Sequence, residues 1–142
     1  MKKLLLILLC LPIIGFGQNV YIPDANFKVY LVGNSSINTN GNAEIQVSEA
    51  AFYNGSIECW GLNISDLTGI EYFTALNSLS CQGNQLTTLD VSQNTDLDFL
   101  MCSSNQLSTL YLNTNITSVF CDGNQLTSIN TSASNALQQL FL

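Results

Sequence analysis

The sequence predicts a solenoid, a stack of short coils made mainly of β-strand with a small helical cap at its N-terminal end. A fourteen-residue pattern, L-x-x-L-x-C-x-x-N-Q-L-[ST]-x-L, occupies residues 97–110. It recurs at 76–89 and, with Ile and Val in place of some leucines, at 116–129. The x-L-x-C-x segment within it alternates with the period of a β-strand. Its cysteine recurs at intervals of 22, 21 and 19 residues, at Cys59, Cys81, Cys102 and Cys121.

Each copy of the pattern is too short to bury its own apolar side chains, so successive coils are expected to stack around one core. Within a strand, Leu100 and Cys102 should point inward, while Phe99, Met101 and Ser103 point outward. Strands of successive coils would then pair in parallel. The outer side of each coil should be extended or form 3₁₀ turns.

An asparagine follows the cysteine by three residues in three of the copies. Its amide has both donors and an acceptor, so an inward asparagine can satisfy backbone groups of the turn that water no longer reaches. The first, looser copy has Leu62 at this place. We therefore expect a ladder of structural side chains formed by Asn84, Asn105 and Asn124.

With a period of 19–22 residues, this pattern resembles the leucine-rich-repeat family. The segment 66–73, D-L-T-G-I-E-Y-F, is similar to internalin-type bacterial versions, and the chain resembles secreted and surface repeat proteins of Bacteroidota. The resemblance implies a leucine-rich-repeat solenoid with a parallel strand ladder on its concave face. It also implies a secreted or cell-surface protein that binds a partner and is not an enzyme.

The repeats are expected over residues 55–142, in about four and a half copies. The last copy begins at Leu137 and stops at Leu142, inside its expected strand. A hydrophobic strand without a cap is an open edge. The sequence therefore predicts a truncated form or fragment of a longer repeat protein.

The four cysteines of the repeats have three possible roles: buried thiols, an occasional disulfide between neighbouring coils, or a metal site. Neighbouring parallel strands are close enough for a disulfide, at about 4.8 Å. However, side chains in register point in the same direction rather than toward each other. Free cysteine also packs like a small hydrophobic residue, which favours buried thiols.

Charge excludes two classes of partner. The basic residues are Lys2, Lys3 and Lys28, against ten acidic residues, and there is no Arg or His. Binding of nucleic acid requires a basic surface that neutralises phosphates, and an anionic membrane surface attracts the same kind of patch. The sequence offers no such basic patch, so it predicts neither nucleic-acid binding nor attraction to an anionic membrane surface. An acidic surface rich in Asn, Ser and Thr is also typical of soluble proteins in general.

Residues 1–17 have the layout of a secretory signal peptide. Lys2 and Lys3 form a basic start, an apolar run follows from Leu4 to Phe16, and Gly17 offers a small residue for cleavage. The run is too short to span a bilayer as a mature helix. Cys10 lies inside it behind the bulky Leu9, which argues against a lipoprotein anchor. We expect a protein secreted or held at the bacterial cell surface, cleaved near Gly17, without a transmembrane segment.

Residues 18–54 are expected to form a helical cap that covers the first coil. Pro23 suits the first turn of a helix and Gly33 its end. A second short helix is expected from Ser48 to Phe52. The loop between them resembles a degenerate EF-hand loop, with Ala43 where the tight turn of that motif has glycine. The resemblance implies at most weak calcium binding, and otherwise a plain capping turn; its oxygen-bearing residues are Asn38, Asn40, Asn42, Glu44 and Glu49.

The sequence contains no catalytic constellation. Without histidine, Ser-His-Asp and Cys-His arrangements are impossible. The densest carboxylate cluster is Asp90, Asp96 and Asp98, whose positions in the repeat lie toward turns and the outer side. Such a cluster is typical of a solvated surface.

The exposed side of the strand ladder is the expected binding surface. One outward position collects Glu58, Ser80, Met101, Phe120 and Phe141, and the position before it includes Phe99. The position after it collects Trp60, Gln82, Ser103 and Asp122. Large apolar patches with a polar rim mark interaction sites, where aromatic residues and Met are enriched. Exposed aromatics scattered on a β-rich surface remain the alternative.

These features predict a non-enzymatic binding module that mediates protein–protein interaction or adhesion. Its partner should be a protein, with a glycan as the second possibility. A structural stalk or scaffold segment of a longer surface protein is the alternative function. The two differ in whether the aromatic residues of the concave face bind a defined partner.

Overall fold

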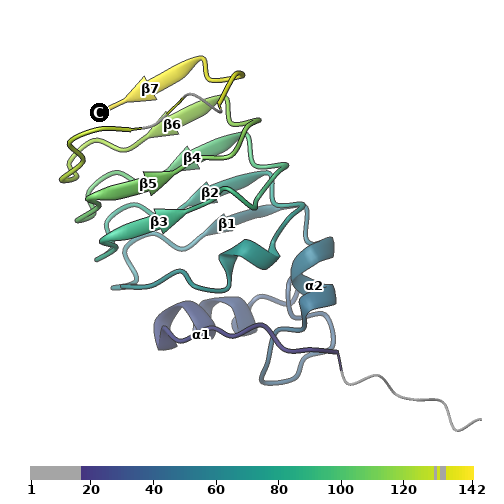
Figure 1. Cartoon of the computed structure of the whole chain (residues 1–142). Helices are drawn as coiled ribbons and strands as arrows, with labels where there is room; N and C mark the ends of the chain where they lie inside the picture. Colours follow the sequence, from purple (N-terminus) through teal and green to yellow (C-terminus); the bar gives the residue numbers. More distant parts are fainter. Residues whose placement is uncertain (1–16, 130, 132–133) are drawn as a thin grey trace, which may run out of the picture.

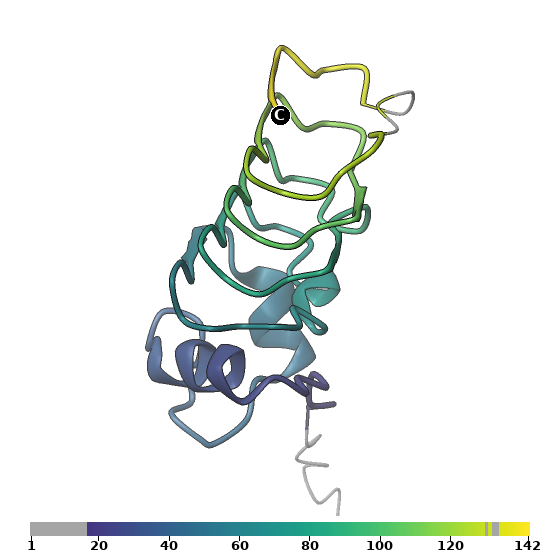
Figure 2. The same cartoon turned by 90° about the vertical axis from the view of Figure 1, so that its left-hand side faces the viewer.

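The computed structural model describes residues 17–129, 131 and 134–142. Apart from Gly17, the predicted signal peptide lies outside the described residues. The described chain is a stack of coils that rises from a cap of two helices, as Figure 1 shows from the side and Figure 2 along the strands. The solenoid and the small helical cap that the repeats predict are therefore confirmed.

One parallel sheet runs the length of the stack. Its strands follow each other in the order β1-β2-β4-β6-β7, one from each successive coil. Ser78, for example, pairs with Phe99, and Met101 pairs with Phe120. This register places equivalent residues of the repeat side by side. The strands are β1 (Ser56–Glu58), β2 (Ser78–Ser80), β4 (Phe99–Met101), β6 (Ser118–Phe120) and β7 (Gln139–Phe141).

Alternation along β1, β2, β4 and β6 separates core from surface, whereas all three residues of the last strand, β7, are exposed. In β4 the middle residue, Leu100, is fully buried, whereas Phe99 and Met101 are partly exposed. Cys102 follows β4 and is also fully buried. The inward and outward positions predicted for this strand are found, because a strand turns successive side chains to opposite faces. We use "concave face" for the outward side of this five-stranded sheet.

The opposite side of the stack contains less regular structure. Two short strands, β3 (Thr88–Asp90) and β5 (Thr109–Tyr111), pair in parallel, with Leu89 beside Leu110. The 3₁₀ helix η1 (Ile70–Tyr72) lies further along an earlier coil, where the Asn94 amide of the next coil donates to the Ile70 carbonyl. We use "outer face" for this side, which lies toward the viewer in Figure 1. Its extended and 3₁₀ backbone agrees with the prediction from the Ser/Thr-rich segments.

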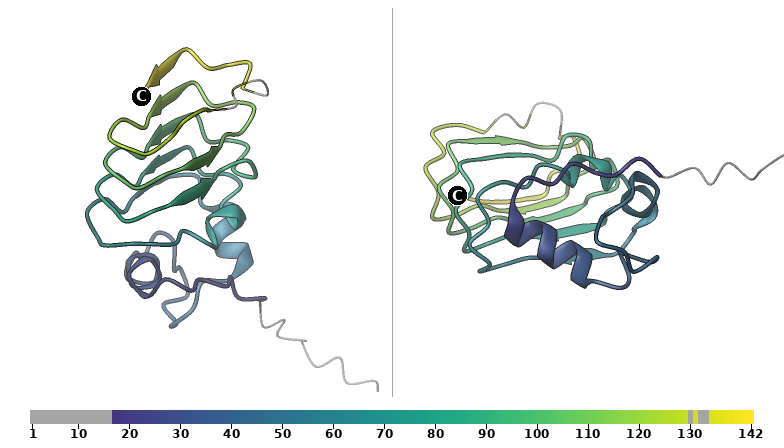
Figure 3. Two further views of the ribbon diagram at one scale, coloured as in Figure 1. Left: turned by 60° about the vertical axis from the view of Figure 1, so that its left-hand side comes forward. Right: turned by 90° about the horizontal axis from the view of Figure 1, so that it is seen from below.

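The cap closes the first coil with two helices, α1 (Ala25–Gly33) and α2 (Val47–Phe52). Figure 3 shows α1 crossing beneath the stack. Phe27 and Leu31 of α1 are fully buried, and Tyr30 packs against the same core. The hydroxyl of Tyr30 accepts a hydrogen bond of 2.8 Å from the backbone N–H of Glu58 in β1. The helix thus covers the apolar end of the first coil and also satisfies a backbone donor of its strand.

The ends of α1 differ from the prediction. Pro23 precedes the helix, and Asp24 is its N-cap: the Asp24 carboxylate accepts from the N–H groups of Asn26 and Phe27. An N-cap aspartate satisfies donors that the helix itself leaves open. At the other end Gly33 is still helical, and Asn34 ends the helix in an extended conformation. The glycine is therefore not the left-handed stop that its position indicated.

Among the residues that the structure describes, none belongs to a helix with the length and apolar character of a membrane span.

Candidate binding surface

The concave face rests on a core in which the cysteines form a column. Cys59, Cys81 and Cys102 are fully buried, and Cys121 is 2% exposed. All four are free thiols. Burial raises the pKa of each thiol, and raises that of Cys59 to about 12. Because the thiolate is the reactive form of cysteine, these side chains are chemically protected.

A ladder of asparagines runs beside the cysteine column. The Asn84 side-chain amide donates to the carbonyls of Cys59 and Cys81, at 2.8 and 3.0 Å. Its oxygen accepts from the backbone N–H groups of Leu62 and Ile64, both at 3.0 Å. Asn84 thus satisfies backbone groups of the first coil, which has Leu62 at the position of the asparagine. Two further rungs repeat the arrangement, at Asn105 and Asn124.

The outer side of the stack has a second polar ladder that the sequence interpretation missed. Asn94 and Asn113 are 0% and 2% exposed. The Asn94 amide donates to the carbonyls of Ile70 and Phe73, and the Asn113 amide donates to those of Asn94 and Leu97. Ser134 continues the series by donating to the Asn113 carbonyl at 2.8 Å. Side-chain hydrogen bonds therefore join successive coils on both the concave and the outer side of the stack.

The concave face brings three predicted aromatic residues together. The rings of Phe120 and Phe141 stack, with centroids 4.6 Å apart and planes 8° from parallel. Phe99 contacts Phe120 from the other side, with centroids 5.6 Å apart and an angle of 42°. Met101 is paired with Phe120 in the sheet register. We call these four residues the aromatic cluster.

The aromatic cluster is at the surface, not in the core. Phe141 is 50% exposed, and Phe99, Met101 and Phe120 are partly exposed. The residues that alternate with them in the strands, Leu100 and Val119, are fully buried. The register therefore assigns the cluster to the solvent side of the sheet by the same alternation that builds the core.

Polar residues border the cluster. The Ser103 hydroxyl donates to the carboxylate of Asp122 at 2.5 Å, which orients that carboxylate in the row after the cluster. In the same row, Gln82 accepts from the hydroxyl of Ser80 at 2.5 Å, and Trp60 is 59% exposed toward the cap. The eight residues predicted for the surface thus lie on adjoining rows of one face. Their role in binding stays a prediction.

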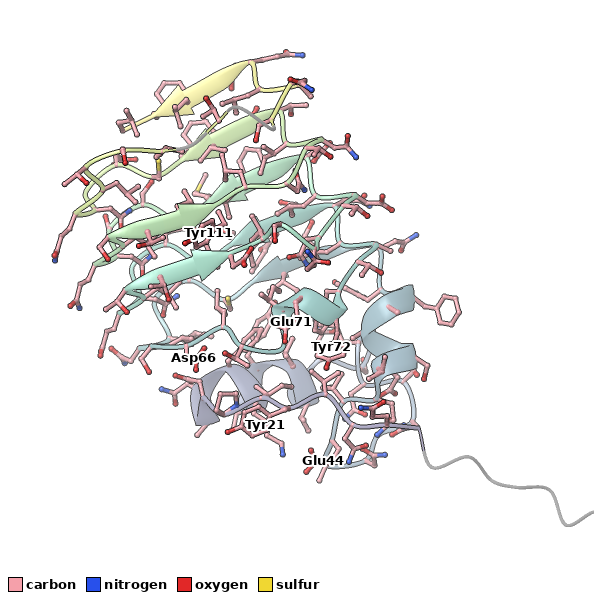
Figure 4. All side chains as sticks on the ribbon, viewed as in Figure 1. Tyr21, Glu44, Asp66, Glu71, Tyr72 and Tyr111 are labelled. Carbon is pink, nitrogen blue, oxygen red and sulfur yellow. The ribbon has the colours of Figure 1, made fainter. Side chains whose placement is uncertain are left out.

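The outer face has a different character. Figure 4 labels Asp66, Glu71 and Tyr111 there, away from the five-stranded sheet. The Asp66 carboxylate accepts from the N–H and hydroxyl of Thr68, and the Glu71 carboxylate accepts from the N–H of Gly69. These acidic groups stabilise turns. In the described part of the chain, no group of three or more Cys, Asp or Glu side chains is placed to bind a metal ion.

The EF-hand-like loop closes through its own hydrogen bonds. The Glu49 carboxylate accepts from the Thr39 hydroxyl and from the N–H groups of Asn40 and Gln46, and so caps α2. Asn38 is buried and donates to the carbonyls of Val32 and Asn42.

Among the described residues, the side-chain oxygen of Asn38 is buried and accepts no hydrogen bond, whereas the side-chain oxygens of Asn40, Asn42 and Glu44 are engaged. Asn40 and Asn42 each accept from an N–H two residues further on, and Glu44 forms an ion pair with Lys28 at 2.7 Å. Calcium binding by this loop stays a prediction.

Known proteins provide the comparison for this architecture. No family model matches the chain. Internalin J of Listeria monocytogenes serotype 4b (strain F2365) is 38% identical over 78 residues, which are 54% of this chain and 8% of that protein. The solved functional domain of InlJ from Listeria monocytogenes, described as including a cysteine ladder, has a TM-score of 0.71 and 36% identity. That alignment covers 87% of this chain and 28% of the solved one.

A crystal structure of the internalin InlF from Listeria monocytogenes (strain 4b F2365) gives a TM-score of 0.56 at 21% identity. It matches 84% of this chain and 43% of that one, and it supports the fold alone. The chain thus spans less than half of each of these relatives. The recurring Leu/Cys/Asn pattern, the parallel strand ladder and these similarities identify the chain as a leucine-rich-repeat protein, similar to the internalins.

Proposed function

We propose that the chain is an exported, non-enzymatic binding module whose concave face holds a protein partner. The aromatic cluster is the main observation in its favour. Its rings, 4.6 and 5.6 Å apart, form an apolar area on a face that is otherwise rich in Ser and Gln. Apolar areas with a polar rim are typical of interaction sites. The similarity to internalin repeats supports the same class of function.

The scaffold beneath the cluster favours binding by a preformed surface. Phe99 and Phe120 stand on strands whose middle residues, Leu100 and Val119, are fully buried, and the two polar ladders join successive coils. A rigid surface loses less conformational entropy when it binds than a flexible one. The concave face can therefore recognise its partner without reorganising.

Ring geometry favours a protein over a glycan. Sugars bind aromatic residues mainly through an open ring face. Phe141 stacks on one side of Phe120 and Phe99 contacts it from the other, because their strands flank β6 on opposite sides. Phe120, at the centre of the cluster, consequently offers its ring edge, which suits aliphatic and aromatic side chains of a protein. Trp60 is 59% exposed but lies nearer the cap.

Export is supported by the leader-like residues 1–17 and is compatible with the cysteines. In an oxidising compartment, exposed thiols are prone to oxidation. The four thiols of the repeats are at most 2% exposed, and burial raises the pKa of each. A chain with this core can keep free cysteines outside the cell.

The proposal is tested by selecting peptides from a phage-displayed library of random 12-residue peptides and comparing their affinity for the wild type and for the double variant Phe99→Ser/Phe120→Ser. The library is selected on the purified exported chain, and each selected peptide is measured against both proteins. Tyr111→Ser is the matched control, because Tyr111 is 57% exposed on the outer face. We expect the double variant to keep the wild-type circular dichroism spectrum and to lose at least tenfold in affinity.

The control should bind within twofold of the wild type. If no selected peptide depends on Phe99 and Phe120, the concave face is not a peptide-binding surface, and the stalk or scaffold role becomes the better account. If the double variant unfolds instead, the two rings belong to the core and the proposal is wrong.

A further inference from the structure

The described chain is strongly acidic. Residues 17–142 contain all ten acidic residues and a single basic one, Lys28, which leaves a net charge of −9. The ammonium of Lys28 contacts both carboxylate oxygens of Glu44, at 2.7 and 2.8 Å. The one basic group of the described part is therefore paired within the cap, far along the sequence from the sheet.

Two carboxylates lie on the concave face, on either side of the aromatic cluster. Glu58 occupies the β1 position of the row that continues through Ser80 and Met101 to Phe120. Asp122 follows Phe120 by two residues and is oriented by the Ser103 hydroxyl at 2.5 Å. Both carboxylates are exposed. The face is thus apolar at its centre and negative at two defined points.

Building on the proposed function, we infer that the partner is a cationic protein segment, in which an apolar side chain contacts the aromatic cluster and basic side chains reach Glu58 and Asp122. A neutral or acidic segment would leave both carboxylates beside an apolar contact without a counter-charge, which opposes binding. Polar-uncharged ligands gain nothing from the net charge of −9. Complementary charge, in contrast, both aligns the segment and accelerates its approach.

The register gives the spacing of these groups. Glu58 and Phe120 are three strands apart, which is about 14 Å at about 4.8 Å per strand. An extended segment advances about 3.3 Å per residue, so a basic residue about four positions from the apolar anchor would reach Glu58. Asp122 is two residues beyond Phe120 along the chain, or about 6.6 Å. This offset runs along the strand, at a right angle to the row from Phe120 to Glu58, so a second basic residue about two positions from the anchor would reach Asp122 with a side chain that extends sideways from the segment.

The peptides selected in the preceding experiment test this inference directly. Those that depend on Phe99 and Phe120 should be enriched in Lys and Arg relative to the unselected library, at about two and about four positions from an apolar residue. The charge variant Glu58→Gln/Asp122→Asn should bind these peptides with at least tenfold lower affinity. Asp66→Asn/Asp90→Asn is the matched control, because it removes the same charge from the outer face. It should change the affinity by less than about threefold at 150 mM salt.

Each outcome separates this inference from the proposed function. Peptides that need Phe99 and Phe120 but contain no excess of basic residues would overturn the cationic partner and leave the binding surface intact. Equal losses of affinity in the two charge variants would also overturn the cationic partner, because only the net charge of the chain would then matter. Binding of glycans, but of no peptide, to the concave face would overturn both.

Discussion

The side-chain amide of Asn105 donates to the backbone carbonyl of Cys81, 3.0 Å away, and so joins one coil to the coil before it. The same amide donates to the carbonyl of Cys102 at 3.1 Å, and its oxygen accepts from the N–H of Leu86 at 3.0 Å. One side chain therefore satisfies three backbone groups that are buried away from water. Such groups occur at every turn of the stack, which explains why the repeat requires a specific polar residue at this position.

Replacing Asn105 by Ala should lower the free energy of unfolding by about 1–3 kcal/mol, because buried backbone groups lose their partners. Gln106 is the next residue and is exposed, so Gln106→Ala should change the free energy of unfolding by less than about 0.5 kcal/mol. Urea denaturation of both variants checks the difference. Equal effects would show that the asparagine ladder does not stabilise the stack.

The first asparagine ladder could be predicted from the sequence and the second could not, for a physical reason. Asn84, Asn105 and Asn124 fall within the fourteen residues whose spacing the strand and its turn fix. The outer ladder lies where the number of residues per coil varies and where the rung itself changes, as Ser134 takes the place of Asn113. Each rung precedes the first apolar residue of the next copy by three positions, at Leu97, Ile116 and Leu137. This spacing could be recognised as a ladder only once the coils were aligned in space.

The concave face was predictable because a strand alternates strictly. Which residues would meet there follows from register: Met101 beside Phe120, and Phe120 beside Phe141. The contact between Phe99 and Phe120 was not predictable, because it runs diagonally between rows and depends on ring rotamers. The end of α1 at Gly33 was predicted, but its conformation was not, since a glycine can be an ordinary last helical residue as well as a left-handed stop.

The turn after each cysteine requires a left-handed backbone. Gly83 has φ +67°, and a Cβ built there would meet only ordinary contacts. Gly83→Ala should therefore destabilise the chain by about 1 kcal/mol, through backbone strain alone. Gly33 lies in open space at the end of α1, without a left-handed φ, so Gly33→Ala should stabilise by about 0.5 kcal/mol. Thermal or urea unfolding that ranks the two variants in the opposite order would contradict this geometry.

Asp24 should give part of the acid sensitivity of the fold. Burial raises the pKa of its carboxyl, but hydrogen bonds from Ser65, Phe27 and Asn26 outweigh burial and leave the pKa below its ordinary value of 3.8. A lowered folded pKa gives stability that is present above the unfolded pKa, near 4, and is lost as the pH falls through the folded pKa. The free energy of unfolding should therefore decrease below about pH 4.

Asp24→Asn should reduce that decrease, which urea denaturation at pH 7 and pH 3 would measure. The difference in the free energy of unfolding between pH 7 and pH 3 should become smaller but not vanish, because hydrogen bonds also lower the pKa of Glu49 despite its burial. Asp96→Asn, at an exposed position, is the control. A wild-type pH dependence in Asp24→Asn would show that the Asp24–Ser65 contact, 2.9 Å from N to carboxylate oxygen, does not link cap and repeats.

Calcium should bind the cap loop weakly at most. Glu49 is the one carboxylate at a coordinating end of the loop, and it already accepts from Gln46 at 3.0 Å to cap α2. Calcium would have to displace these bonds, and affinity rises with the number of carboxylates in such a loop. Calorimetry with millimolar calcium, with Glu49→Gln as the comparison, measures this. Micromolar binding that Glu49→Gln abolishes would show that the loop rearranges into a true calcium site.

The central claim is that coils stack so that four cysteine side chains form one internal column, which fixes the strands and thereby the concave face. Its most direct test is the rate at which a thiol reagent such as dithionitrobenzoate labels the native protein at pH 8. Because Cys59, Cys81, Cys102 and Cys121 are at most 2% exposed and burial raises the pKa of each, labelling should be slow in buffer and rapid and complete in urea. Rapid labelling of all four thiols in the native protein would contradict the stacked architecture.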